Sequence, residues 1–146
     1  MTNEIIKGIA AVLNGTFGSE YDVYAEDVPQ GFKEPCFSIV HILSDRSAKL
    51  PNRYLSRNKF DIHYFPKSEH RKKAEIRSVA ESLFLSLEYI NVLDNLCRGT
   101  KMSYEIIDGV LHFFVNYDMY VVKDKVPEPY MMTLEKQTST LEENNG

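Results

Sequence analysis

The sequence predicts an α+β domain: a mostly antiparallel sheet with two helices packed on one face, in the order α-β-β-β-α-β-β. Two segments carry apolar residues at helical spacing, and several short runs alternate with period two. One Asp-Gly pair joins two β-prone runs late in the chain. Aromatic residues make up 12% of the 146 residues, with nine Tyr and eight Phe, which favours strands over a helix bundle.

The two helices are predicted over residues 3–17 and 69–89, with Ser68 as the N-cap of the second. Both segments repeat apolar residues in steps of three and four, as a helix with one buried face requires. The apolar positions are Ile5, Ile6, Ile9, Leu13 and Phe17 in the first segment and Ile76, Val79, Ala80, Leu83, Phe84, Leu87 and Ile90 in the second.

Three strands are predicted between the helices, over residues 21–25, 36–43 and 53–65. The second has apolar residues on both sides, which indicates an internal strand. Residues 44–51 are polar and contain breakers, so we interpret them as a long hairpin tip. Residues 91–100, after the second helix, are expected to form a connection into the last hairpin.

That hairpin turns at Asp108 and Gly109, because a type I′ turn needs positive φ at both central residues. Its register pairs Ile107 with Val110 and places Glu105 beside His112 on one side of the sheet. The opposite side, expected to be core, pairs Ile106 with Leu111, Tyr104 with Phe113 and Met102 with Val115. The side with His112, which includes Phe114 and Tyr120, is too apolar for simple exposure, so we interpret it as a surface that meets another chain.

The charge is strongly segregated along the chain. Residues 46–77, the basic band, carry a net charge of +7, between −5 over residues 1–45 and −6 over residues 78–146. Three interpretations are open: a solvated surface, a nucleic-acid footprint, and a self-complementary head-to-tail contact. The total charge of −4 weighs against nucleic acid. Basic residues in the first turns of the second helix oppose its dipole, which points to a partner.

No catalytic motif is present: the chain has no Gly-rich phosphate loop, no H-E-x-x-H, no C-x-x-C and no G-x-S-x-G. Asp61 and His63 share one strand face, and Glu105 is expected opposite His112, so a metal or acid–base site is conceivable. Such pairs are more often ordinary strand contacts. We therefore predict no catalytic residues, no metal and no cofactor.

Residues 1–126 are predicted to form a single domain. Residues 127–146 follow two prolines and are expected to be a tail that is disordered alone or an arm on a neighbouring subunit. No apolar run approaches the roughly 20 residues that cross a bilayer, so no membrane is expected as a partner.

Three blocks of the sequence resemble the tail terminator family of phages and prophages of Gram-positive bacteria. They are GFKEPCFSI (31–39), NRYLSRNKFDIHYFP (52–66) and RGTKMSYEIIDGVLHFFVNYDMYV (98–121), and the resemblance runs over about residues 3–125. It implies an α+β subunit of a ring, typically a hexamer, on the head-proximal end of the tail tube. Such a ring stops tube polymerisation, joins the head and neck proteins, contacts the last sheath ring in contractile tails, and performs no enzymatic step.

The resemblance implies a virion protein of the tail and neck, assembled in the host cytoplasm, with itself and the tail tube protein as partners. A contractile or non-contractile tail, and a full phage or a headless particle such as a bacteriocin, are equally compatible. The alternatives are a small nucleic-acid-binding module using the basic band and a metal enzyme using Asp61 and His63. The predicted interface residues are Arg46, Lys49, Arg53 and Arg57 in the loop before the third strand, Arg71, Lys72 and Lys73 on the second helix, and Phe114 and Tyr120 on the hairpin.

Overall fold

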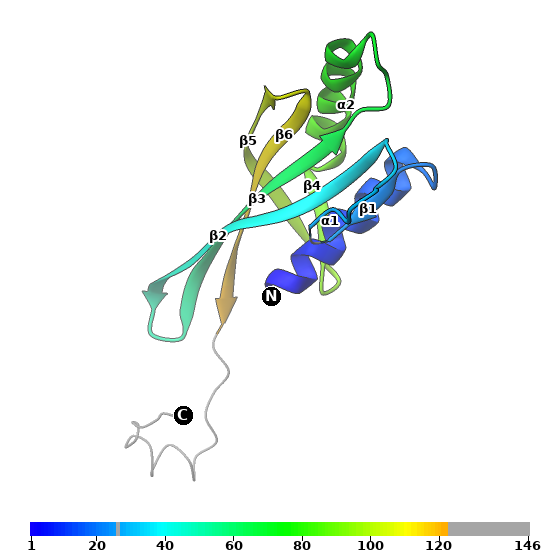
Figure 1. Ribbon diagram of the computed structural model, residues 1–146. Coiled ribbons are helices and arrows are strands. Elements are labelled where there is room, and N and C mark those ends of the chain that lie inside the picture. The colour runs from blue at the N-terminus through cyan, green and yellow to red at the C-terminus, as the bar shows by residue number, and fades with distance from the viewer. Residues whose placement is uncertain (26, 123–146) are drawn as a thin grey trace. The chain divides into compact units, whose positions relative to one another are not determined.

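A computed structural model of the chain describes residues 1–25 and 27–122 (Figure 1). Its helices and strands bear out the predicted α+β class. The elements are α1 (Thr2–Phe17), β1 (Asp22–Tyr24), β2 (Cys36–Leu50), β3 (Arg53–Phe65), α2 (Lys72–Ser86), β4 (Tyr89–Val92), β5 (Asn95–Ile107) and β6 (Val110–Val122).

The six strands form one sheet in the order β1-β2-β3-β6-β5-β4. Strand β5 is antiparallel to both β4 and β6, whereas β1 is parallel to β2, so the sheet is mixed. The consequence for function is that β3 and β6, which are far apart in the sequence, lie side by side in the middle of the sheet.

Strand β4 is an element that the sequence pattern did not predict, because residues 91–100 were expected to be a connection. The chain instead reverses at Leu93 and Asp94, whose φ angles are 50° and 65°. Val92 and Asn95 close the turn as a pair. Asp94 is a residue that tolerates positive φ, but Leu93 rarely adopts it, so the pair lacks the full signal of a two-residue turn.

The last hairpin has the predicted register near its turn. Asp108 and Gly109 have φ angles of 51° and 75°, and the ladder pairs Glu105 with His112 as expected. Farther from the turn the register shifts between Thr100 and Ser103. The predicted pairing of Met102 with Val115 falls at the β-bulge that interrupts the ladder, where no pair is assigned.

The hairpin of β2 and β3 is longer than predicted. Strand β2 continues through the polar residues 44–50, and only Pro51 and Asn52 form the turn. The predicted loop before the third strand is thus strand, and its basic residues are strand residues. Polar composition misled the prediction because most side chains of this part of β2 are exposed.

Both helices lie on the same face of the sheet and contact each other (Figure 1). Their buried residues form one cluster with the strand residues beneath them, and burying each large apolar side chain stabilises the fold by about 1.5–3 kcal/mol. The fully buried members include Ile5, Ile9 and Leu13 of α1, Ile76 and Leu83 of α2, Phe37 of β2, Ile62 of β3 and Phe113 of β6.

Helix α2 begins later than predicted, at Lys72, and Ser68 does not cap it. Glu75, in its first turn, accepts hydrogen bonds from the backbone N–H groups of Lys67 and Ser68, both at 2.8 Å, and from the Tyr64 hydroxyl. Burial opposes ionisation of Glu75, but these hydrogen bonds prevail and lower its pKa. The carboxylate therefore ties the segment before α2 to β3.

The chain divides into two compact units. The first comprises residues 1–47 and 55–119 and holds both helices and the buried cluster. The second comprises residues 48–54 and 120–146, and its described part consists of the β2–β3 turn with the adjoining strand ends and residues 120–122 of β6. The predicted boundary between residues 126 and 127, and the tail beyond it, lie outside the described residues.

Candidate functional site

The sheet has a polar face that the helices do not cover, which we call the outer face. Its side chains alternate along each strand with the buried residues of the core. The outer face consists of Lys59, Asp61 and His63 of β3, His112, Phe114 and Asn116 of β6, and Lys101, Ser103 and Glu105 of β5.

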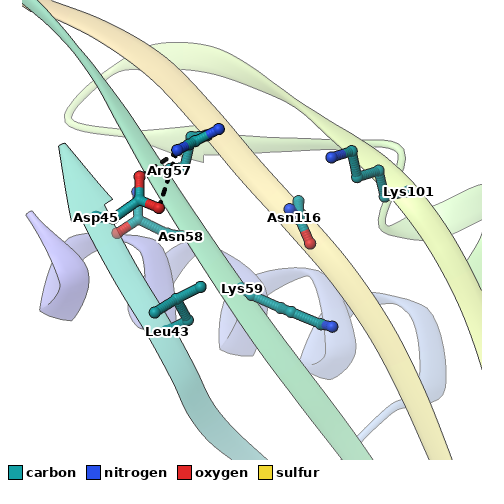
Figure 2. A pocket seen from close by; sticks show the side chains of 7 residues that line it. All are labelled: Leu43, Asp45, Arg57, Asn58, Lys59, Lys101 and Asn116. Atoms are coloured by element: carbon teal, nitrogen blue, oxygen red, sulfur yellow. Dashed lines mark hydrogen bonds and ion pairs between the residues drawn. The ribbon is translucent and has the colours of Figure 1, made fainter. Parts of the chain in front are cut away.

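A groove runs across part of this face (Figure 2). Its one ion pair among the described residues joins Arg57 to Asp45: Nε and Nη2 of the guanidinium donate to the two carboxylate oxygens at 2.8 and 3.0 Å. This bidentate pairing fixes the plane of the guanidinium. The groove is lined by Leu43, Asp45, Arg57, Asn58, Lys59, Lys101 and Asn116.

Asn58 lies between Arg57 and Lys59 on the buried side of β3 and is only 1% exposed. Its side-chain carbonyl accepts a hydrogen bond from the Ser44 hydroxyl at 2.8 Å. Its amide nitrogen donates to the Ser56 hydroxyl and to the Tyr117 carbonyl, both at 3.1 Å. Because these partners belong to β2, β3 and β6, one buried side chain links three adjacent strands.

Two lysines give the outer face its positive charge. Lys59 Nζ lies 5.4 Å from the centre of the Phe114 ring, within the range of a cation–π contact. A second hollow beside the groove shares Lys59, Lys101 and Asn116 with it. Within the described residues neither lysine forms an ion pair, so both are available to an acidic group of a partner.

Three ionisable side chains meet elsewhere on the outer face. Asp61 Oδ2 lies 3.0 Å from His63 Nε2 and 3.0 Å from His112 Nδ1, and the two imidazole centres are 4.3 Å apart. Burial favours the neutral carboxyl, but the hydrogen bonds and electrostatic interactions with the two histidines outweigh it and lower the pKa of Asp61. Asp61 is therefore an ionised carboxylate that accepts hydrogen bonds from both imidazoles.

The predicted interface residues occupy three separate places. Arg46, Lys49, Arg53 and Arg57 lie on β2 and β3; Arg71, Lys72 and Lys73 are exposed where α2 begins, beside a shallow hollow formed by residues 69–74. Phe114 is half-buried beside Lys59, whereas Tyr120 is 63% exposed. Their role as an interface remains a prediction.

Sequence patterns did not reveal the groove or the meeting of Asp61 with His112. Lys101, Asp45 and Asn116 were not predicted as site residues, and His112 was paired only with Glu105. Both arrangements depend on β3 lying next to β6, which no local pattern reveals. The one usable signal was alternation, which placed Asp61 and His63 on the same strand face.

A model of a known protein family matches most of this chain. The sequence model of a family described as phage tail terminator protein matches residues 4–129 of this chain. A search of curated proteins found no match. Among the described residues, every helix is too short or too polar to pass through a lipid bilayer.

Proposed function

Because this chain belongs to the phage tail terminator family, we propose that it forms a ring that caps the tail tube, stops tube polymerisation and provides the attachment surface for head and neck proteins. Family membership gives it a structural role in the phage tail, and the family is not known as an enzymatic one. The finer assignment is supported above all by one observation: basic side chains are concentrated on exposed surfaces of the subunit.

A ring built head to tail needs two different complementary surfaces on each subunit. The outer face offers one, because Lys59 and Lys101 line adjoining hollows without an ion pair to any described residue. The exposed residues Arg71, Lys72 and Lys73 at the start of α2 offer another basic surface. The acidic segments of a neighbouring subunit or of the tube would complement them.

We assign the ring six copies, the tail tube protein as its direct partner, and sheath and neck proteins as further partners. The protein would then be a virion component at the junction of tail and neck. Nucleic-acid binding through the basic band is the weaker alternative, because Arg57 is already paired with Asp45 and the whole chain is acidic.

Tube polymerisation in the presence of the chain tests this proposal. Adding the wild-type chain should stop growth of the cognate tube protein, followed by light scattering and by tube length in electron micrographs. Replacing Arg71, Lys72 and Lys73 by Glu should abolish this effect without unfolding the chain. Lys7→Glu, an exposed charge reversal on α1, is the matched control and should still stop growth.

The proposal fails if the wild-type chain leaves tube length unchanged over a range of chain-to-tube ratios. If the variant with Glu at positions 71, 72 and 73 stops growth as well as the wild type, this surface is not part of the interface. Circular dichroism of each variant confirms that the comparison is between folded proteins.

A further inference from the structure

The cluster of Asp61, His63 and His112 lies on the outer face but lines neither of the two hollows that hold Lys59 and Lys101. Its three side chains come from two strands that are neighbours only in the folded sheet. One potential ligand atom from each lies within 4.8 Å of the others. A carboxylate and two imidazoles are the ligand types that bind zinc and related divalent metals.

We propose that Asp61, His63 and His112 form a binding site for one first-row divalent metal ion of the Zn²⁺ type. The site would join β3 to β6 on the outer face and serve the structure of the subunit. It requires no catalytic step, and it goes beyond the proposed ring function.

The distances suit such an ion. Four ligands placed tetrahedrally about 2.0–2.1 Å from zinc lie about 3.3 Å from one another. The two nitrogen–oxygen separations in the cluster are both 3.0 Å, so small side-chain rotations would make room for the ion. Each neutral imidazole would carry its proton on its other ring nitrogen. The lone pairs of His63 Nε2 and His112 Nδ1 would then be free to coordinate the ion.

An independent observation is the second oxygen of the carboxylate. Asp61 is 8% exposed, and its Oδ1 is buried with no hydrogen-bond partner among the described residues. A buried carboxylate oxygen without a partner is costly, and bidentate coordination through Oδ1 as well as Oδ2 would satisfy it. His63 and His112 are half-buried at the surface of the cluster, so an ion and its water ligand can enter from solvent.

The local charge also favours a cation. Glu105 lies directly opposite His112 in the β5–β6 ladder, which adds a second carboxylate to this part of the outer face. Cross-strand neighbours of this kind have Cβ atoms about 4.5–5.5 Å apart, within reach of a long side chain. The Asp61 carboxylate and a divalent ion together carry a net charge of +1, which the Glu105 carboxylate would neutralise.

Titration of the untagged, chelator-treated full chain with ZnCl₂ tests the proposal by calorimetry and by the thermal unfolding midpoint. We expect one saturable Zn²⁺ per chain and a rise in the midpoint, because an ion that binds only the folded state stabilises it. MgCl₂ at the same concentration should leave the midpoint unchanged, since Mg²⁺ prefers all-oxygen ligands.

His63→Asn and His112→Asn should each weaken Zn²⁺ binding by about tenfold or more. His70→Asn, a change of an exposed histidine outside the cluster, is the matched control and should bind like the wild type. The proposal would be overturned if the wild type showed no saturable binding, or if both cluster variants bound Zn²⁺ as tightly as the wild type.

If a cluster variant fails to fold, the imidazole NMR signals of the wild type provide the test. Zn²⁺ should shift the signals of His63 and His112 and leave those of His41 and His70 in place. Shifts confined to His41 and His70 would show that the ion binds elsewhere and would overturn the assignment.

Discussion

Two glycines of helix α1 should respond to alanine substitution with opposite signs. A Cβ added at Gly8 would lie 2.5 Å from the backbone oxygen of Asn91 and 3.3 Å from Cδ1 of Ile90. The backbone of β4 cannot rotate away as a side chain can, so α1 and β4 would have to separate. At Gly15 no atom lies within 4 Å of the added Cβ.

The magnitude follows from two terms. Overpacking a close contact costs about 1–3 kcal/mol, whereas Ala is favoured over Gly within a helix by about 0.5–1 kcal/mol. The midpoints of these two ranges differ by about 1 kcal/mol, so Gly8→Ala should lower the free energy of unfolding by about 1 kcal/mol. Gly15→Ala carries only the second term and should raise it by about 0.5–1 kcal/mol.

Urea unfolding followed by circular dichroism measures both variants against the wild type under the same conditions. Opposite shifts of the midpoint at an unchanged slope would support the packing of α1 on β4. A Gly8→Ala variant as stable as the wild type would refute the close approach of the helix to Asn91.

Three further predictions concern the fold around the site. Glu75→Gln should lower the free energy of unfolding above about pH 4.5, and the difference from the wild type should shrink as the solution is acidified. A carboxyl with a lowered folded-state pKa stabilises the protein above its unfolded-state pKa, and this stabilisation is lost as the pH falls through the folded-state pKa. Unfolding free energies measured between pH 7 and 3 test this. Asn58→Ala should lower the free energy of unfolding by about 2 kcal/mol, because it removes buried hydrogen bonds. Asn116→Ala is the control and should cost about 0.5 kcal/mol or less, because its side chain forms no hydrogen bond in the described structure. Equal losses would contradict the proposed link of β2, β3 and β6 through Asn58. Gly109→Val should destabilise by about 1–2 kcal/mol through strain at φ 75°, and an unchanged unfolding midpoint would contradict the turn conformation.

Local patterns predicted the elements that have local causes. The Asp108–Gly109 turn set the register of the last hairpin, and apolar residues at helical spacing located both helices. The bulge near Lys101, whose φ is 51°, left no trace in the sequence, because the residue is not one that favours positive φ. Leu93 also disfavours positive φ, so the Leu93–Asp94 turn, and with it β4, went unpredicted.

The site was harder to predict because it depends on contacts between distant segments. Asp61 and His63 could be placed on one face of a strand by alternation alone. Their contact with His112 requires the neighbouring position of β3 and β6, which follows from the packing of the whole sheet. The pairing of Arg57 with Asp45 likewise depends on a strand that extends through residues expected to be a loop.

Native mass spectrometry of the full chain, alone and mixed with its cognate tube protein, tests the central claim most directly. The proposed function predicts closed assemblies of six copies, either free or formed only on the tube end. A chain that stays monomeric in both samples, while the tube protein assembles normally, would contradict it.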